Sequence, residues 1–204
     1  MAIEFFTVSS YDGPDIERTL TMPDNNLKEE LRQLLIDKAL ITGDITLASG
    51  EKSNFYFDGK QVTLDPQGIL VTSKVILAML HGQNINAVGG PTLGADPIAA
   101  GVSLLSSQSG HPLKAFIVRK EAKAHGTQKM IEGPALSEGD RVVMLEDVIT
   151  TGESVLKAIQ EVEKLKAKVV RVVCLVDRGQ GAVERLAAYN YTPLFTLQDL
   201  GLQI

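Results

Sequence analysis

Short apolar runs alternate with helical periodicity along most of this chain. The clearest strand predictions are residues 141–146 and 169–176, and shorter ones fall at 87–88, 113–118 and 193–196, the last as an edge strand. Helices are predicted from Asp65-Pro66 to about residue 80, through Ile98 and Leu105, and at 154–166 and about 181–189. This alternation predicts an α/β fold, with a central mostly parallel sheet, right-handed crossovers and helices on both faces.

The N-terminal quarter of the chain has a different pattern. Residues 1–24 contain Gly13, Pro14 and Pro23 among mixed polar residues, and we interpret them as a loose N-terminal arm. A helix is predicted from Asn25-Asn26, with Glu29 placed as in a capping box. Its apolar stripe consists of Leu27, Leu31, Leu34 and Leu35. Residues 44–63 mix Gly, Ser, Tyr and Phe, which favours strands and turns. Residues 25–204 are therefore expected to form a single domain.

Composition limits the classes of protein to consider. The chain has 204 residues, of which 44% are hydrophobic and 22% charged, as in a soluble globular protein with a sizeable core. Its net charge of −5 argues against a broad nucleic-acid surface. Cys174 is the only cysteine, which excludes an intrachain disulfide and a zinc cluster of cysteines. With no long apolar span and no signal pattern, we expect a cytoplasmic protein that does not bind membranes.

The most informative stretch follows the strand predicted at 141–146. Glu146 and Asp147 fall at the end of that strand, the small-residue turn Thr150-Thr151-Gly152 comes next, and Ser154 is placed to cap the following helix. The start of a helix offers unpaired N–H groups to a phosphate. Carboxylates beside it repel that phosphate, but they accept hydrogen bonds from sugar hydroxyls or hold a metal shell. The stretch thus predicts a site for a phosphorylated ribose, unless it is an ordinary strand–turn–helix corner with solvated acids.

The stretch Glu146-Asp147-Val148-Ile149-Thr150-Thr151-Gly152 resembles the phosphoribosyl pyrophosphate (PRPP) motif of type I phosphoribosyltransferases. The resemblance implies their fold, a mostly parallel sheet flanked by helices with a small N-terminal hood, here about 44–63. It also implies a set of PRPP-binding residues in and after the motif. These are Glu146, Asp147, Val148, Ile149, Thr150, Thr151, Gly152, Glu153 and Ser154, with Asp147 also catalytic.

A second stretch, Arg119-Lys120-Glu121-Ala122-Lys123-Ala124-His125-Gly126, follows the strand predicted at 113–118. Alone, such a charge run is more often a solvated loop. It also resembles the catalytic loop of orotate phosphoribosyltransferases. That resemblance implies that Arg119, Lys120, Lys123 and His125 bind the pyrophosphate of PRPP, and that Lys123 and His125 are catalytic. It implies a mobile loop at about 119–134 that reaches across a homodimer interface.

Three further stretches resemble the same family. Residues 49–58 resemble its hood, which implies that Tyr56 and Phe57 lie against the orotate ring; otherwise they belong to a small hydrophobic cluster. Arg178 follows the strand predicted at 169–176 and suits a carboxylate, although an arginine solvated at the sheet rim fits the sequence as well. The resemblance assigns Arg178 and Thr150 to orotate. Residues 89–94 resemble the loop beneath the pyrophosphate, or make a tight glycine turn.

Two positions depart from the pattern of many family members. Ala48 replaces a lysine before the hood's Ser-Gly, and Leu93-Gly94 replaces an aromatic–lysine pair in the pyrophosphate loop. Two cations for the pyrophosphate are therefore missing. We expect weaker PRPP binding, or compensation by Lys52, by Lys60 or by a tighter Mg2+ requirement.

The resemblance implies an enzyme that transfers the 5-phosphoribosyl group from PRPP to orotate, giving orotidine 5′-phosphate and pyrophosphate in de novo pyrimidine (UMP) biosynthesis. Mg2+ is the implied cofactor, held mainly by PRPP and water rather than by direct protein ligands. One alternative is a purine-type phosphoribosyltransferase, from which Arg178 would distinguish it. Another is a non-catalytic regulator that senses PRPP and binds nucleic acid, for which an acidic chain without a basic stripe is poorly suited.

Overall fold

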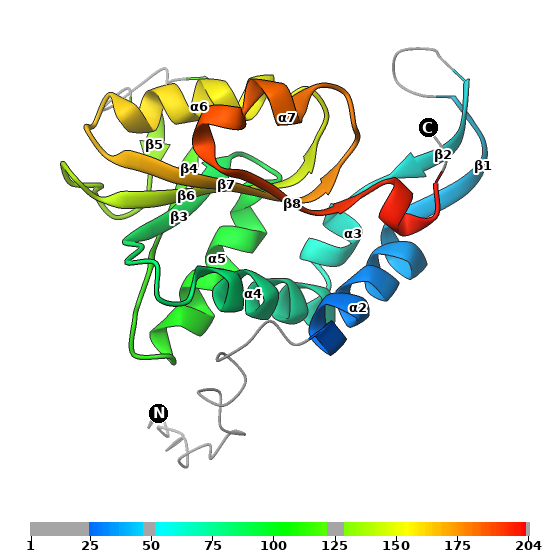
Figure 1. Cartoon of the computed structure of the whole chain (residues 1–204), viewed down its shortest axis with the longest axis horizontal. Coiled ribbons are helices and arrows are strands. Elements are labelled where there is room, and N and C mark those ends of the chain that lie inside the picture. The colour runs from blue at the N-terminus through cyan, green and yellow to red at the C-terminus, as the bar shows by residue number, and fades with distance from the viewer. Residues whose placement is uncertain (1–24, 47–51, 122–128, 203–204) are drawn as a thin grey trace, which may run out of the picture.

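A computed structural model describes residues 25–46, 52–121 and 129–202 (Figure 1). The N-terminal arm predicted at 1–24 lies outside these residues. The helices and helical turns are α2 (Asn25–Leu34), η1 (Leu35–Ala39), α3 (Lys60–Thr63), α4 (Pro66–Leu80), α5 (Ala95–Ser107), α6 (Glu153–Glu163), α7 (Ala182–Arg185), η2 (Ala187–Tyr189) and η3 (Gln198–Leu200). The strands are β1 (Leu40–Thr46), β2 (Lys52–Phe57), β3 (Ala87–Pro91), β4 (Lys114–Val118), β5 (Ile131–Glu132), β6 (Arg141–Ile149), β7 (Lys168–Asp177) and β8 (Tyr191–Thr196).

The main sheet has six strands in the order β5-β4-β3-β6-β7-β8. Every neighbouring pair is parallel except β4 and β5, which are antiparallel. The fold is therefore the predicted α/β class with a mostly parallel sheet, and β8 is the predicted edge strand. β1 and β2 form a separate antiparallel pair beside the main sheet (Figure 1).

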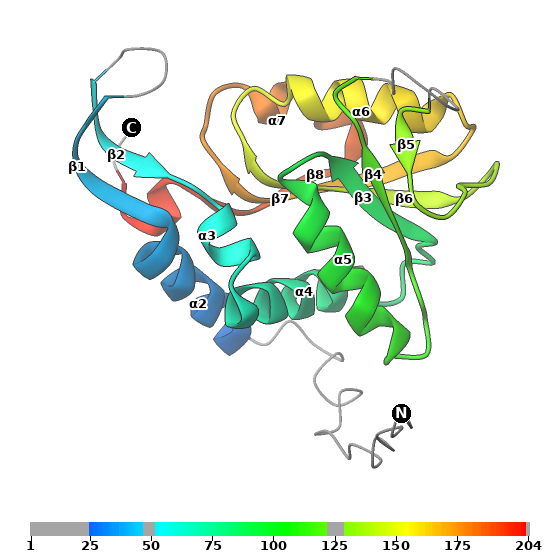
Figure 2. The ribbon, with the colours of Figure 1, turned by 180° about the vertical axis from the view of Figure 1, so that it is seen from behind.

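Helices cover both faces of the main sheet, with α6 and α7 on one face and α4 and α5 on the other (Figures 1 and 2). Burial follows this layering in two apolar clusters. One cluster packs α2, α4 and α5 against the sheet around Leu31, Ile76 and Leu145, and the other packs α6 against it around Ile159 and Met144. Packing on both faces explains why residues 142–145 of β6 form an unbroken apolar run.

The start of α4 confirms the prediction at Asp65-Pro66. The Asp65 carboxylate accepts hydrogen bonds from the N–H groups of Gln67 at 3.1 Å and Gly68 at 2.9 Å, and Pro66 occupies the first helical position. These bonds satisfy N–H groups that have no carbonyl partner in the first turn of a helix.

Four local predictions need correction. β6 continues past the two acids to Ile149, because the apolar residues Val148 and Ile149 extend its pairing with β7. The cap of α6 is Gly152 rather than Ser154, because a left-handed backbone (φ 79°) ends the turn one residue before Glu153. The 44–63 segment includes the helix α3. The segment predicted at about 181–189 is split between α7 and η2.

Within the described residues, no helix combines the length and the apolar character that crossing a bilayer requires.

Candidate active site

The two acids of the predicted PRPP motif lie at the centre of the sheet, on the strand between β3 and β7. Glu146 and Asp147 expose only 9% and 5% of their surfaces. Backbone groups bind both carboxylates: Glu146 Oε1 accepts the Asp147 N–H at 3.2 Å, and Asp147 Oδ1 accepts the Val148 N–H at 2.8 Å. Burial, and then the neighbouring charge of Asp147, raise the pKa of Glu146 well above its ordinary value. The free protein thus holds two carboxylates close together, and a hydroxyl-bearing ligand or a cation bound there would stabilise their negative charge.

Lys60 is the cation closest to these acids among the described residues. Its Nζ lies 3.0 Å from Asp147 Oδ2 and 3.4 Å from Asp58 Oδ1. Burial lowers the pKa of Lys60, but the hydrogen bond and charge of Asp147, with those of Asp58, outweigh it and leave the pKa above its ordinary value. Sequence reasoning considered Lys60 only as a replacement for a missing pyrophosphate cation. The pairing with Asp147 joins residues 87 positions apart, and no local pattern signals it.

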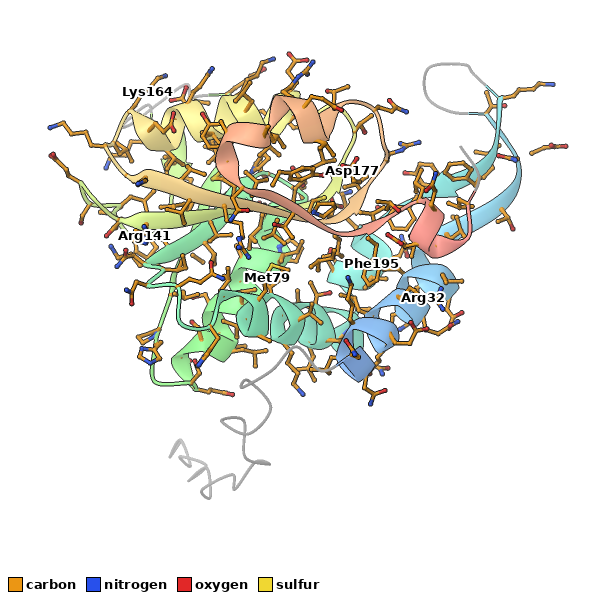
Figure 3. All side chains as sticks on the ribbon, viewed as in Figure 1. Arg32, Met79, Arg141, Lys164, Asp177 and Phe195 are labelled. Carbon is orange, nitrogen blue, oxygen red and sulfur yellow. The ribbon has the colours of Figure 1, made fainter. Side chains whose placement is uncertain are left out.

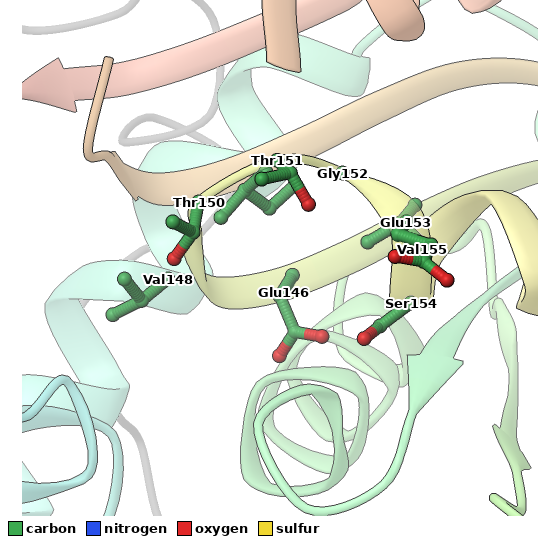
Figure 4. A pocket seen from close by; sticks show the side chains of 9 residues that line it. Glu146, Val148, Thr150, Thr151, Gly152, Glu153, Ser154 and Val155 are labelled. Atoms are coloured by element: carbon green, nitrogen blue, oxygen red, sulfur yellow. The ribbon is translucent and has the colours of Figure 1, made fainter. Parts of the chain in front are cut away.

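The turn after β6 lines a pocket at the place where the sequence predicts an anion cradle. Residues 148–155 and Glu146 line a pocket of about 130 Å3, into which the side chains of Glu146 and Ser154 point (Figure 4). The first backbone bond of α6 runs from the Leu156 N–H to the Gly152 carbonyl at 3.0 Å. The N–H groups before Leu156 in that turn therefore have no carbonyl of the helix to bond, and they suit a phosphate. Glu153 adds little repulsion, because Lys157 Nζ lies 2.7 Å from its carboxylate.

The glycine loop after β3 lies directly against the acids. A Cβ atom added at Gly94 would overlap the carboxylate oxygens of Glu146 and Asp147, and one added at Gly90 would overlap the Leu145 carbonyl. Gly94 is therefore the residue that allows this close approach. The same contact gives a physical reason for the departure noted at Leu93-Gly94: in this arrangement the acids occupy the space that a side chain at position 94 would need.

Replacing Glu146 with glutamine should stabilise the free protein and impair its activity. An acid whose pKa is raised on folding is destabilising in its ionised form, and that cost is absent below its unfolded pKa and complete above its folded pKa. The Tm of Glu146→Gln should therefore exceed that of the unchanged protein by about 2–4 °C at pH 8, and by less at pH 5. Thermal unfolding at both pH values measures this. An equal or lower Tm at pH 8 would contradict the burial cost assigned to Glu146.

The described ends of the predicted catalytic loop meet at the edge of the sheet. The Arg119 N–H bonds to the Met130 carbonyl at 2.8 Å, and Arg119 Nη1 lies 3.7 Å from Glu132 Oε1. Lys120 is exposed. Lys123 and His125 lie outside the described residues, so their roles and that of the loop remain predictions.

The two hood aromatics lie on opposite faces of β2. Tyr56 exposes 42% of its surface, whereas Phe57 exposes 5% and belongs to the apolar cluster around Leu31. Alternation along a strand explains this difference. Of the pair, Tyr56 is the one available to a ligand, and contact of either residue with orotate remains a prediction.

Arg178 directly follows the carboxyl end of β7, and the two acids lie near the carboxyl end of the neighbouring strand β6. The Arg178 N–H donates to the Ile149 carbonyl at 2.9 Å, which fixes the Arg178 backbone beside Thr150, the first residue of the turn after β6. The Arg178 Nε is buried and has no hydrogen-bond partner among the described residues. A buried donor without an acceptor is costly, and a bound carboxylate would supply one.

The described residues contain no cluster of three or more His, Cys, Asp or Glu side chains arranged to hold a metal ion. At the acids, the available oxygen donors are the carboxylates of Glu146 and Asp147. Two carboxylates are too few to bind a metal ion on their own, but they suit Mg2+ whose other ligands are water and substrate phosphates.

Comparisons with known proteins agree with this geometry. The family model described as "Phosphoribosyl transferase domain" matches residues 75–196, from within α4 to the end of β8. These residues contain the glycine loop, both acids, the cradle and Arg178. Fold and site therefore define a phosphoribosyltransferase.

Proteins of similar sequence show which kind of phosphoribosyltransferase this is. The orotate phosphoribosyltransferase of Nostoc sp. is 45% identical over 178 residues, covering 86% of each chain. That of Streptomyces coelicolor is 41% identical, covering 87% of this chain and 98% of its own. The chain belongs to the orotate phosphoribosyltransferase family.

Solved structures give the same result. The crystal structure of Mycobacterium tuberculosis H37Rv orotate phosphoribosyltransferase in complex with Fe(III) dicitrate has a TM-score of 0.78 at 37% identity, covering 86% of this chain and 99% of that one. The complex of the same enzyme with PRPP has a TM-score of 0.72 at 33% identity, with the same coverage.

Proposed function

We propose that this protein transfers the 5-phosphoribosyl group of PRPP to orotate, forming orotidine 5′-phosphate and pyrophosphate for pyrimidine biosynthesis. The observation that carries the proposal is the end of β6 together with the turn that follows it. There Glu146 and Asp147 lie beside a cradle of unpaired N–H groups at the start of α6, as a ribose with a 5′-phosphate requires. Arg178 lies at the same edge of the sheet, where the base would be.

In this proposal, the ribose 2′ and 3′ hydroxyls donate to Glu146 and Asp147, while residues 150–154 bind the 5′-phosphate. Positive charge develops on the ribose as the bond from its anomeric carbon to the pyrophosphate lengthens. The Asp147 carboxylate stabilises that charge from a buried, preorganised position. Lys60 holds Asp147 in place before the substrate arrives.

Orotate is oriented in the same proposal by Arg178, which binds its carboxylate, with Thr150 and Tyr56 near its ring, while the buried Phe57 supports the strand that carries Tyr56. The ring nitrogen then attacks the anomeric carbon. Arg119, Lys120, Lys123 and His125 neutralise the departing pyrophosphate, with Lys123 and His125 nearest the breaking bond. Orientation and electrostatics supply the acceleration, and no covalent enzyme intermediate is needed.

Mg2+ is the proposed cofactor. Glu146 and Asp147 are the residues that would help to hold it, and most of its ligands would come from PRPP and water. When bound, Mg2+ lowers the charge of the pyrophosphate leaving group. We also propose a cytoplasmic homodimer in which the 119–134 loop of each protomer completes the site of its partner.

The test is pyrophosphate release from purified protein given PRPP and Mg2+, with orotate, adenine, hypoxanthine or no base. We expect release with orotate at a rate at least about 100-fold above that with either purine, since the purines offer no carboxylate to Arg178. Release with a purine instead would identify a purine-type enzyme. PRPP binding without release from any base would identify a non-catalytic sensor.

A further inference from the structure

A row of hydrogen-bonded polar side chains connects the edge strand β8 to the turn that carries Arg178, and its two members on β7, Cys174 and Asp177, are buried. Cys174 Sγ lies 3.0 Å from the Tyr191 hydroxyl, and this hydroxyl donates to Asp177 Oδ2 at 2.9 Å. The other carboxylate oxygen, Asp177 Oδ1, accepts the Gly179 N–H at 2.7 Å. Asp177 lies at the end of β7, where the chain leaves the sheet (Figure 3).

The hydrogen-bond direction along this chain is determined by the protonation of its members. Burial raises the pKa of the Cys174 thiol, and burial together with Cys174 and Asp177 raises that of the Tyr191 hydroxyl, so both groups keep their protons at neutral pH. The single proton of the Tyr191 hydroxyl points to Asp177. The thiol therefore donates to the Tyr191 oxygen, the Tyr191 hydroxyl donates to Asp177, and Asp177 only accepts.

Asp177 is a costly residue to bury. Only 3% of its surface is exposed, and the hydrogen bonds that it accepts come from two neutral donors, the Tyr191 hydroxyl and the Gly179 N–H. A buried carboxylate is maintained only where such donors are aimed at it. Its two oxygens face in two directions, one toward the edge strand β8 and the other toward the backbone just after Arg178. It therefore fixes the far side of the Arg178 turn.

The near side of the same turn is fixed by a different bond. The Arg178 N–H donates to the Ile149 carbonyl, and Ile149 directly precedes the phosphate turn. The Arg178 backbone is thus bonded before and after its side chain, and the guanidinium keeps a buried Nε without a partner. The Arg178 guanidinium can bind an anion in one fixed orientation only if the backbone of its turn is held in place.

We infer that Asp177 and Tyr191 are positioning residues for orotate. They act through the Asp177–Gly179 turn and orient the Arg178 guanidinium toward the carboxylate of the base. This inference rests on the proposed function. It assigns a role in base binding to a tyrosine on the edge strand, a residue that neither the PRPP motif nor the loop pattern singles out.

The main test is Tyr191→Phe, which keeps the ring and removes only the hydroxyl. Its KM for orotate should rise about 5- to 10-fold, which corresponds to about 1–1.4 kcal/mol, the net contribution of one ordinary hydrogen bond, while its KM for PRPP stays within about twofold. Tyr189→Phe is the matched control, because Tyr189 lies in η2 just before β8 and its hydroxyl does not contact Asp177. It should leave both KM values unchanged.

Two more variants separate positioning from simple structural support. Asp177→Asn keeps an oxygen for the Gly179 N–H and an amide for the Tyr191 oxygen, so its orotate KM should stay closer to that of the unchanged enzyme than Asp177→Ala does. In a cycle with Arg178→Lys, the Tyr191→Phe change should lose most of its effect on kcat/KM for orotate. That loss is expected only if Tyr191 acts through Arg178.

The unchanged enzyme is assayed first. If it does not convert orotate and PRPP, the proposed function fails, whatever the variants do. If it does, the inference is overturned by an orotate KM that Tyr191→Phe leaves unchanged, by equal rises in both KM values, or by full additivity in the cycle. If Tyr191→Phe does not fold, the comparison of Asp177→Asn with Asp177→Ala decides: equal orotate KM values would overturn the inference.

Discussion

Replacing Asp147 with asparagine should lower kcat by about 100- to 1,000-fold, with little change in Tm. The amide has nearly the same size and still accepts the Val148 N–H, so the local fold has no reason to change. What disappears is a buried negative charge beside the proposed ribose site, where positive charge would develop in the transition state. Lys60, 3.0 Å away, also loses its main partner and is left paired only with Asp58, so the positive charge at this place is less well compensated. Steady-state rates with saturating PRPP and orotate measure the effect.

A matched control lies just before the same strand. Asp140 also pairs with a lysine, Lys114, at 2.8 Å, but at the opposite end of β6. Asp140→Asn should leave kcat within about twofold. If Asp147→Asn retained more than a tenth of the original kcat, or if Asp140→Asn lost as much as Asp147→Asn, the catalytic role of the Asp147 charge would have to be abandoned.

Replacing Arg178 with alanine should lower kcat/KM for orotate by about 100-fold, because losing one partner of a desolvated charge pair typically costs 2–5 kcal/mol. The KM for PRPP should change by less than about threefold, since Arg178 does not line the pocket proposed for the ribose phosphate. Initial rates with each substrate varied in turn separate these two effects.

Arg171→Ala provides the comparison for Arg178, because Arg171 lies on the same strand, near its other end. It should leave both KM values unchanged. If Arg178→Ala raised the KM of PRPP as much as that of orotate, Arg178 would contribute to the phosphoribosyl site, and the selectivity for a base with a carboxylate would need another explanation.

Features set by neighbours in the sequence could be predicted, and those set by distant contacts could not. The apolar run at 142–145 and the mostly apolar run at 169–176 predicted β6 and β7 because both faces of these strands are buried. The PRPP motif is continuous, so its acids and its turn could be placed together from the sequence. The cap of α6 was wrong by two residues, because serine is a favoured cap and the left-handed Gly152 depends on how β6 ends.

The contacts that connect separate elements left no signal in the sequence. Lys60 reaches Asp147 only because α3 lies next to the end of β6, and Tyr191 reaches Asp177 only because β8 pairs with β7. The tight fit of Gly94 against the acids depends on the approach of the loop after β3 to β6. In the hood, alternation along β2 could have shown that Tyr56 and Phe57 face opposite ways, once that segment was recognised as a strand.

The two borders of the six-stranded sheet have a bearing on self-association. One border is β8, which contains Pro193, and proline on an outer strand cannot donate the N–H that an added strand would need. The other border is β5, which is only two residues long and is followed by Gly133 and Pro134. Both borders therefore resist strand-by-strand growth into aggregates, a hazard for any open sheet. Copies of this chain would consequently have to associate by contacts other than extension of the six-stranded sheet.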